Sequence, residues 1–278
     1  MNKDFVLNTT KNEKIRITTY GYENLETAPC LIFVHGFKGF KDWGFWPYTA
    51  EIILPIKDYF VLTFNFSHNG IGETLTEFTE LDKFADNTFS LELEELNEII
   101  DAYLNNFFGV KSNKRIGIVG HSRGGGDSLI VSSKRKEINA VVLWASVANF
   151  NRYSERQARE WRKNGVFEVL NTRTNQMMRL NVSLLDDIEN NKVDLLNLEK
   201  AAKNLNKPLL IVHGEQDLSV KIEEGEQIYN WSNKEKTEFY KIKATGHTFD
   251  IAHPFEGTNP KFDLVLEKTL NFFNKNLN

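Results

Sequence analysis

The chain has 278 residues, a length that suits one large domain or two small ones. Hydrophobic residues make up 41% and charged residues 26%, which is ordinary for a globular protein and argues against long disordered segments. The formal net charge of −4 gives no reason to expect nucleic acid or an anionic membrane as a partner.

Cofactor and membrane signals are absent from the sequence. The single cysteine, Cys30, excludes an intrachain disulfide and a cysteine-rich metal site. No H-E-x-x-H motif or clustered histidine spacing occurs, so we expect no metal and no cofactor. The segment from Met1 to Arg16 is polar and lacks the apolar core of a signal peptide. No uncharged apolar run approaches the ~20 residues of a membrane span, and we expect a cytoplasmic protein.

The first predicted elements form an antiparallel hairpin at one edge of a sheet, from Asp4–Leu7 and Ile15–Tyr20. Short apolar runs that end at Gly, His or Ser then follow, and they are typical of buried parallel strands: Leu31–Val34, Val61–Phe66, Ile116–Val119, Ala140–Leu143 and Leu209–Val212. Helical patterns lie between these runs. The clearest has apolar residues at alternating spacings of three and four: Phe89, Leu93, Leu96, Ile100, Tyr103 and Phe107.

The later elements continue this alternation. Lys221–Tyr229 is a helix candidate, Thr237–Ile242 a strand candidate, and the amphipathic stretch Lys261–Phe273 a closing helix. Strand–helix repetition of this kind predicts an α/β fold, with a mostly parallel sheet of about eight strands and helices on both faces.

The segment 149–206 interrupts this alternation because it contains no clear strand. A structureless loop of that length is uncommon, so we interpret it as an inserted cap of helices, with a short hairpin as an option. The core domain would then comprise residues 1–148 and 207–278. The first part of the cap carries a group of four arginines: Arg152, Arg156, Arg159 and Arg162. We interpret them as a solvated helix face beside Glu155 and Glu160, and a cationic rim for negatively charged substrates is the alternative.

The sequence Gly120-His121-Ser122-Arg123-Gly124 matches G-x-S-x-G and lies between a predicted strand and a predicted helix. In a nucleophile elbow the serine occupies this sharp turn, and Gly120 and Gly124 avoid clashes with the backbone beside it. The following helix N-terminus supplies positive partial charge where an oxyanion forms. A dinucleotide fingerprint or a P-loop would need a spacing that the local glycines do not have.

A serine nucleophile needs a base that an acid holds in place. Asp217 follows the predicted strand at 209–212, and His247 follows the predicted strand at 237–242. We therefore predict a triad of Ser122, Asp217 and His247 at the carboxyl edge of the sheet, where open α/β sheets place their sites. Glu215 and Asp250 are the alternative acids.

The remaining histidines are assigned other roles. His253 is the rival base, and His68 is a candidate pocket residue in a turn after a strand. His35, His121 and His213 are interpreted as structural.

The oxyanion hole is predicted to use two backbone N–H groups, those of Arg123 and Phe37. Gly36 lets the loop after the strand at 31–34 approach the serine, and the Phe37 ring is a candidate wall of the acyl pocket.

Together these motifs resemble the α/β-hydrolase superfamily: His35-Gly36-Phe37, Gly120-His121-Ser122-Arg123-Gly124-Gly125, His213-Gly214-Glu215-Gln216-Asp217 and Gly246-His247-Thr248-Phe249. More narrowly, the chain is similar to small bacterial carboxylesterases of the dienelactone-hydrolase and cinnamoyl or feruloyl esterase type. The resemblance covers nearly the whole chain from Ile15 and is weakest in the cap. It implies Ser122 as nucleophile, His247 as base and acid, and Asp217 as the orienting acid. Dienelactone hydrolases resemble a cysteine-nucleophile pattern, so the serine argues against that chemistry.

The expected activity is hydrolysis of a small-molecule carboxylic ester with a small or aromatic acyl group. A thioesterase or acyltransferase, a peptidase, and a catalytically silent ligand-binding protein remain alternatives. The related proline-specific peptidases usually carry a propeller or long extra domain, for which this chain is expected to be too short. A homodimer is a candidate assembly.

Overall fold

The structure, a computed structural model, describes residues 1–277. It contains an eight-stranded sheet with the order β1-β2-β4-β3-β5-β6-β9-β10. Its strands are β1 (Lys3–Asn8), β2 (Lys14–Tyr20), β3 (Cys30–Val34), β4 (Phe60–Asn65), β5 (Ile116–His121), β6 (Ile138–Trp144), β9 (Leu209–Gly214) and β10 (Thr237–Ile242). Strand β2 is antiparallel to both β1 and β4, and all other neighbours are parallel, which confirms the predicted fold class.

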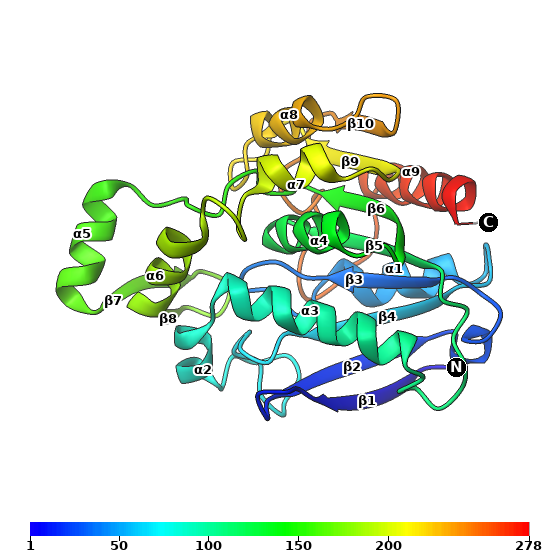
Figure 1. Ribbon diagram of the computed structural model, residues 1–278, viewed down its shortest axis with the longest axis horizontal. Helices are drawn as coiled ribbons and strands as arrows, with labels where there is room; N and C mark the ends of the chain where they lie inside the picture. The colour runs from blue at the N-terminus through cyan, green and yellow to red at the C-terminus, as the bar shows by residue number, and fades with distance from the viewer. Residues whose placement is uncertain (278) are drawn as a thin grey trace.

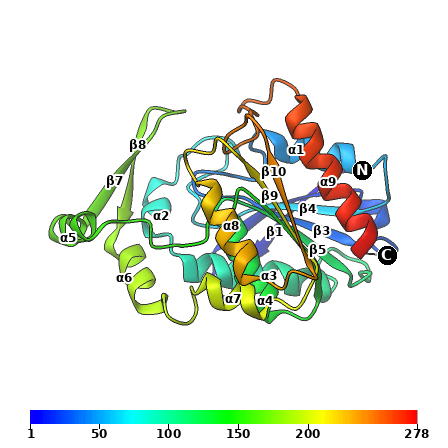
Figure 2. The same cartoon turned by 90° about the horizontal axis from the view of Figure 1, so that it is seen from above.

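Helices cover both faces of this sheet (Figures 1 and 2). Alternate residues of β3 point to opposite faces, so Ile32 and Val34 belong to one apolar core and Leu31 and Phe33 to the other. The first core is covered by α3 (Phe89–Leu104), α4 (Arg123–Lys134), α7 (Leu198–Asn204) and α8 (Ile222–Trp231), and the second by α1 (Phe45–Ile53) and α9 (Pro260–Asn276). A short 3-10 helix, η1, spans Tyr22–Asn24.

The predicted helix that begins at Phe89 is shorter than its apolar spacing indicates. Thr88 caps it by accepting a hydrogen bond from the N–H of Leu91, and it ends at Leu104. Phe107 therefore lies beyond the helix, with 38% of its surface exposed. The last member of the periodic pattern is wrong as a helical residue, because the chain has already turned.

Between β6 and β9 the chain leaves the sheet and forms a projecting segment (Figure 1). It consists of α5 (Glu155–Asn164), a two-stranded antiparallel hairpin of β7 (Val166–Asn171) and β8 (Gln176–Asn181), and α6 (Val182–Asn191). Trp161 is fully buried inside this segment and donates its indole N–H to the Leu180 carbonyl at 2.8 Å. The division into core and cap at residues 149 and 206 stays a prediction.

Contacts of β8 and α6 join the projecting segment to the rest of the molecule. Strand β8 packs against α2 (Leu81–Asp86), where Asn181 Nδ2 donates to Asp86 at 2.6 Å. Helix α6 packs against α3, where Asp187 accepts hydrogen bonds from the backbone N–H and the hydroxyl of Ser90. The segment therefore stands beside the carboxyl ends of the strands. None of the helices in the described part of the chain has the length and apolar character of a membrane span.

Candidate active site

Ser122 occupies the turn between β5 and α4 in a backbone conformation that side chains rarely adopt. Its φ is 58° and its ψ is −121°. The turn is held by its own backbone, because the Ser122 N–H donates to Trp144 O at 2.9 Å and its carbonyl accepts from Gly125 and Val147. Such strain persists only where the surroundings fix it, and here it presents the hydroxyl at the sheet edge.

The glycines around Ser122 are required by close approach. A Cβ on Gly120 would lie 2.3 Å from the carbonyl oxygen of Gly124 across the turn. A Cβ on Gly36 would lie 2.9 Å from the Cβ of Ser122 and 3.3 Å from the Arg123 nitrogen. The loop after β3 therefore reaches the nucleophile only because Gly36 has no side chain.

The loops after β9 and β10 bring an acid and a histidine to the same place. His247 Nε2 lies 2.9 Å from the Ser122 hydroxyl, and His247 Nδ1 lies 2.7 Å from Asp217 Oδ2. The parallel strands end at one edge of the sheet, so residues far apart in sequence become hydrogen-bonded neighbours. The structure thus brings together the three residues that the sequence selects.

Asp217 is buried, and its second oxygen accepts the backbone N–H groups of Ser219 and Val220 at 2.8 and 2.9 Å. Burial alone would raise the pKa of this carboxyl, but hydrogen bonds from His213 and His247 hold that pKa well below its usual range. The group is therefore ionised and orients the His247 ring.

The alternative acids lie elsewhere. Glu215 is exposed to solvent. Asp250 pairs with Lys261 at 2.6 Å.

Two neighbouring histidines are structural. His121 donates to the His247 carbonyl at 2.9 Å, and burial lowers its pKa to about 3. His35 accepts the Phe66 N–H at 3.3 Å and donates through Nδ1 to the Gly36 carbonyl, and burial lowers its pKa to about 4. Both rings are neutral at pH 7. Their hydrogen bonds to the His247 and Gly36 carbonyls fix the loops that carry these residues.

The other histidines are placed apart from the serine. His253 Nδ1 accepts the Gly44 N–H at 3.0 Å and its ring packs on Phe40, so it serves the loop before α1. His68 hydrogen-bonds the Ser67 hydroxyl and lines neither cavity beside Ser122. No group of three or more His, Cys, Asp and Glu within residues 1–277 could hold a metal ion.

Two cavities meet at Ser122. The main cavity has a volume of about 310 Å³ and the side cavity about 120 Å³, and both are lined by Phe37, Lys38, Ser122 and His247. The backbone N–H of Phe37 has no protein acceptor in the described chain, and Arg123 is the first residue of α4, where N–H groups lack intrahelical acceptors. Both N–H groups are therefore free to bind a ligand, and both residues line the main cavity together with Ser122.

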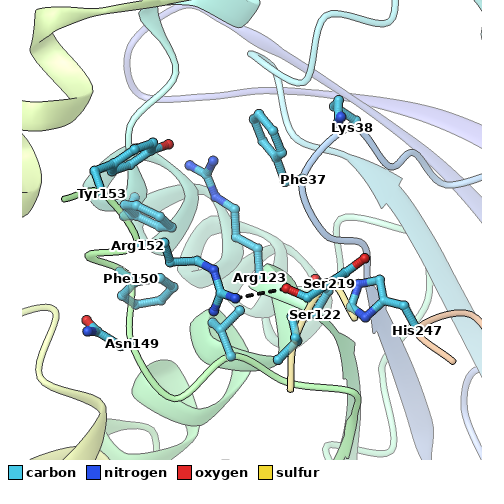
Figure 3. Close-up of a pocket in the computed structure, with 13 residues that line it drawn as sticks. Phe37, Lys38, Ser122, Arg123, Asn149, Phe150, Arg152, Tyr153, Ser219 and His247 are labelled. Atoms are coloured by element: carbon cyan, nitrogen blue, oxygen red, sulfur yellow. Dashed lines mark hydrogen bonds between the residues drawn. The ribbon is translucent and has the colours of Figure 1, made fainter. Parts of the chain in front are cut away.

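The walls of the main cavity include residues that the sequence reasoning did not select. Phe150 and Tyr153 come from the chain just after β6, and Ser219 from the loop after β9 (Figure 3). Their only sequence signal is a position shortly after a strand that ends at the site edge. Arg152 also lines this cavity, where it pairs with Glu224 at 2.7 Å and donates to the Ser219 carbonyl.

The three other arginines of the 152–162 group do not line the main cavity. Arg156 and Arg159 pair with Glu160 and Glu155 on the exposed face of α5. Arg162 bridges Asp186 and Glu189 of α6. These contacts fit a solvated helix face.

A buried charge network supports the first turn of α4. Arg123 donates to Glu92 at 2.6 Å, and Glu92 also accepts from Asn87 at 2.8 Å. Asp127 lies beside them with no exposed surface, and its pKa is raised by burial and by the Glu92 charge. Burial therefore favours the neutral form of Asp127, and the ion pair of Arg123 is with Glu92.

Comparison with known proteins gives the family and the fold. The sequence profile of the prolyl oligopeptidase family matches residues 81–278. No curated protein sequence matches the chain. An α/β hydrolase from Penicillium sp. sh18 aligns over 100% of this chain and 99% of its own, with a TM-score of 0.74 and 16% identity. Est1E from Butyrivibrio proteoclasticus, solved with ferulic acid bound, aligns over 98% of both chains with a TM-score of 0.72 and 17% identity.

An esterase domain from Rhodothermus marinus aligns over 100% of both chains, with a TM-score of 0.65 and 19% identity. At these identities the solved structures establish the fold, and the profile establishes the family. The predicted resemblance to the α/β-hydrolase superfamily is thereby confirmed. The chain belongs to the prolyl oligopeptidase family and is a hydrolase with the α/β-hydrolase fold.

Proposed function

We propose that the chain is a serine carboxylesterase that works through an acyl-enzyme on Ser122. The observation that carries the proposal is the continuous hydrogen-bonded relay from Asp217 through His247 to the Ser122 hydroxyl, open to two cavities. A serine without such a relay is a poor nucleophile at neutral pH.

The proposed reaction has two halves. His247 Nε2 takes the proton of Ser122 as its oxygen attacks the ester carbonyl, and Asp217 stabilises the imidazolium that forms. The N–H groups of Phe37 and Arg123 stabilise the tetrahedral oxyanion. His247 then protonates the departing alcohol, and a water molecule repeats the sequence on the acyl-enzyme and releases the acid. No metal or cofactor takes part in these steps.

The shape of the site favours an ester with one larger group. The main cavity carries the rings of Phe37, Phe89, Phe150 and Tyr153. Est1E, which shares the fold, binds ferulic acid, an aromatic acid, and this supports an aromatic or similarly apolar group in the main cavity. The side cavity would then take the smaller part.

A peptidase is the second candidate, because the family is named for oligopeptidases. The same relay and oxyanion donors serve amides and esters, so the leaving group distinguishes the two activities. An ester and an amide with the same acyl group should be compared. A higher kcat/KM on the amide than on the ester would favour the peptidase.

The decisive test is labelling with a fluorophosphonate probe read by intact mass. We expect stoichiometric labelling of the wild-type protein and none of Ser122→Ala. Absence of labelling in a folded wild-type sample would overturn the proposal and favour a silent ligand-binding protein.

A further inference from the structure

The guanidinium of Arg123 has a donor that no protein atom satisfies. Its Nε binds Glu92, and its Cζ lies 3.9 Å from the Phe89 ring centroid. Nη2 is buried and has no hydrogen-bond partner among the described residues, and only 6% of the Arg123 surface is exposed. Such an unmade hydrogen bond is costly, so an acceptor from outside the protein is expected.

The main cavity is where that acceptor would lie. Arg123 lines this cavity, and Figure 3 shows its guanidinium between the side chains of Phe37 and Tyr153. Its neighbours in the wall are aromatic side chains, and the one hydroxyl among them, that of Tyr153, accepts no hydrogen bond from Nη2. A bound ligand would therefore supply the missing partner.

The charges around the cavity indicate the kind of acceptor. The lining contains three cations, Lys38, Arg123 and Arg152, and no carboxylate. Glu92 and Glu224 neutralise the two arginines from outside the lining. Lys38 has no such partner within residues 1–277, because its ammonium donates only to the Leu170 carbonyl, at 3.3 Å.

A fourth cation lies close to Lys38. Arg173, in the turn between β7 and β8, places its guanidinium 5.2 Å from the Phe40 ring centroid and 5.6 Å from that of Phe78. It forms no ion pair in the described chain. Burial, and then the charge of Arg173, lower the pKa of Lys38. An anion beside Lys38 would relieve the repulsion between the two cations.

We propose that the substrate carries a carboxylate on the part that fills the main cavity. Arg123 Nη2 binds this carboxylate, and the charges of Lys38 and Arg173 attract it. The inference rests on the proposed esterase function and narrows it to half-esters of dicarboxylic acids or esters of comparable charge. The aromatic walls hold the apolar chain between the ester and the carboxylate. Hydrolysis consumes one water and releases the dicarboxylic acid and the alcohol.

The test compares 4-nitrophenyl half-esters of straight-chain dicarboxylic acids with the same esters whose second carboxyl is methylated. Acetate esters of ω-hydroxy acids and their methyl esters place the carboxylate on the alcohol side instead. A hydrogen bond to a charged group supports a preference on the order of 10- to 100-fold in kcat/KM for the charged member at its best chain length. We expect this preference in one of the two series.

Arg123→Lys and the double variant Glu92→Gln/Arg123→Met test the residue itself. The lysine keeps the charge opposite Glu92 but lacks Nη2, and the double variant leaves no unpaired buried carboxylate. The readout is the ratio of the two substrates, because any rate loss caused by the Arg123 backbone position affects both equally. We expect the ratio to fall about tenfold in each variant. Lys38→Met should reduce the ratio less and make it less sensitive to salt.

Binding to Ser122→Ala, measured by calorimetry with the intact half-ester and its methylated counterpart, tests the cavity without turnover. If wild-type protein reacts with the fluorophosphonate probe, equal affinity for both compounds, or equal kcat/KM of the unlabelled enzyme at every chain length, overturns the inference and leaves the esterase proposal standing. A neutral ester that carries a terminal hydroxyl in place of the carboxylate and matches the half-ester in kcat/KM also overturns the inference. Failed labelling together with selective binding would instead overturn the esterase function alone.

Discussion

The region around the Ser122 turn, called the elbow, buries its charged side chains, whereas the projecting segment exposes them to solvent. Beneath the elbow, Glu92, Glu95 and Asp127 are 4%, 1% and 0% exposed. In the projecting segment, the Arg156–Glu160 pair leaves 82% and 56% of its side chains exposed. Buried carboxylates must be hydrogen-bonded or protonated, whereas exposed pairs are screened by water.

This difference shows where sequence changes should matter. Around the elbow Arg123 and Glu92 are held by specific hydrogen bonds, so substitutions there alter geometry and pKa values. In α5 the charged groups are exposed to solvent, and the segment affects the site through residues such as Arg173, whose charge lowers the pKa of Lys38 in the cavity wall. Rate should therefore depend on the first region, and substrate choice partly on the second.

The largest loss of activity is expected when the hydrogen-bonded relay of Asp217, His247 and Ser122 is broken. His247→Ala should lower kcat by roughly 10⁴- to 10⁶-fold, because it removes the base that activates Ser122. Esterase assays and circular dichroism measure rate and fold together. His253→Ala is the matched control, and we expect it to keep kcat within about tenfold, since His253 is not in the relay. A His247→Ala enzyme that retained normal turnover would falsify the assignment.

The second-largest effect is expected at Gly36, where the backbone lies close to Ser122. Gly36→Ala would place a methyl group 2.9 Å from the Ser122 Cβ and displace the Phe37 N–H. We expect kcat to fall by about 10²- to 10³-fold, as when one oxyanion donor is lost.

The control for Gly36→Ala is Gly246→Ala. A Cβ at Gly246 would meet nothing nearer than 3.7 Å, although the residue precedes His247. Its rate should stay close to wild type. Equal losses in both variants would show that both loops are sensitive to any added methyl group, against the steric explanation.

Stability should depend on pH through Glu95, whose pKa burial raises from 4.5 to about 7. Between these pH values the folded state keeps the proton and the unfolded state has lost it, so wild-type stability falls as pH rises from 4.5 to 7. The upper limit of this loss is about 3 kcal/mol. Glu95→Gln should remove the loss, and urea unfolding at pH 5 and pH 8 measures it.

Glu94→Gln, on the exposed side of the same helix, is the control for the Glu95 measurement and should keep the wild-type pH dependence. If Glu95→Gln also kept it, another buried group would be responsible.

The smallest effect is expected on the surface of α5. Arg156→Ala removes an exposed ion pair, so the melting temperature and kcat/KM should both stay unchanged within error. Thermal melts and assays with the half-ester are the measurements. A clear fall in kcat/KM for charged substrates alone would instead support the alternative interpretation, in which this helix forms a cationic rim for negatively charged substrates.

The sequence was sufficient for the fold and the relay because their signals are local. The motif around Ser122, and Asp217 and His247 at strand ends, occupy positions that a parallel sheet brings to one edge. The pairing of Arg123 with Glu92 could not be predicted, because it depends on how α3 packs against α4. The hairpin at 166–181 was only an option, since its strands are short and half-exposed.

The loop that holds Asp217 has a consequence for enzyme engineering. Ser219 and Val220 bind the Asp217 carboxylate with their backbones and also form part of the main cavity wall. Arg152 anchors the same loop through the Ser219 carbonyl. A library that reshapes this wall for a new acyl group would shift the acid behind His247 as well. Selectivity and turnover should therefore evolve together here, and gains in one would need compensating changes for the other.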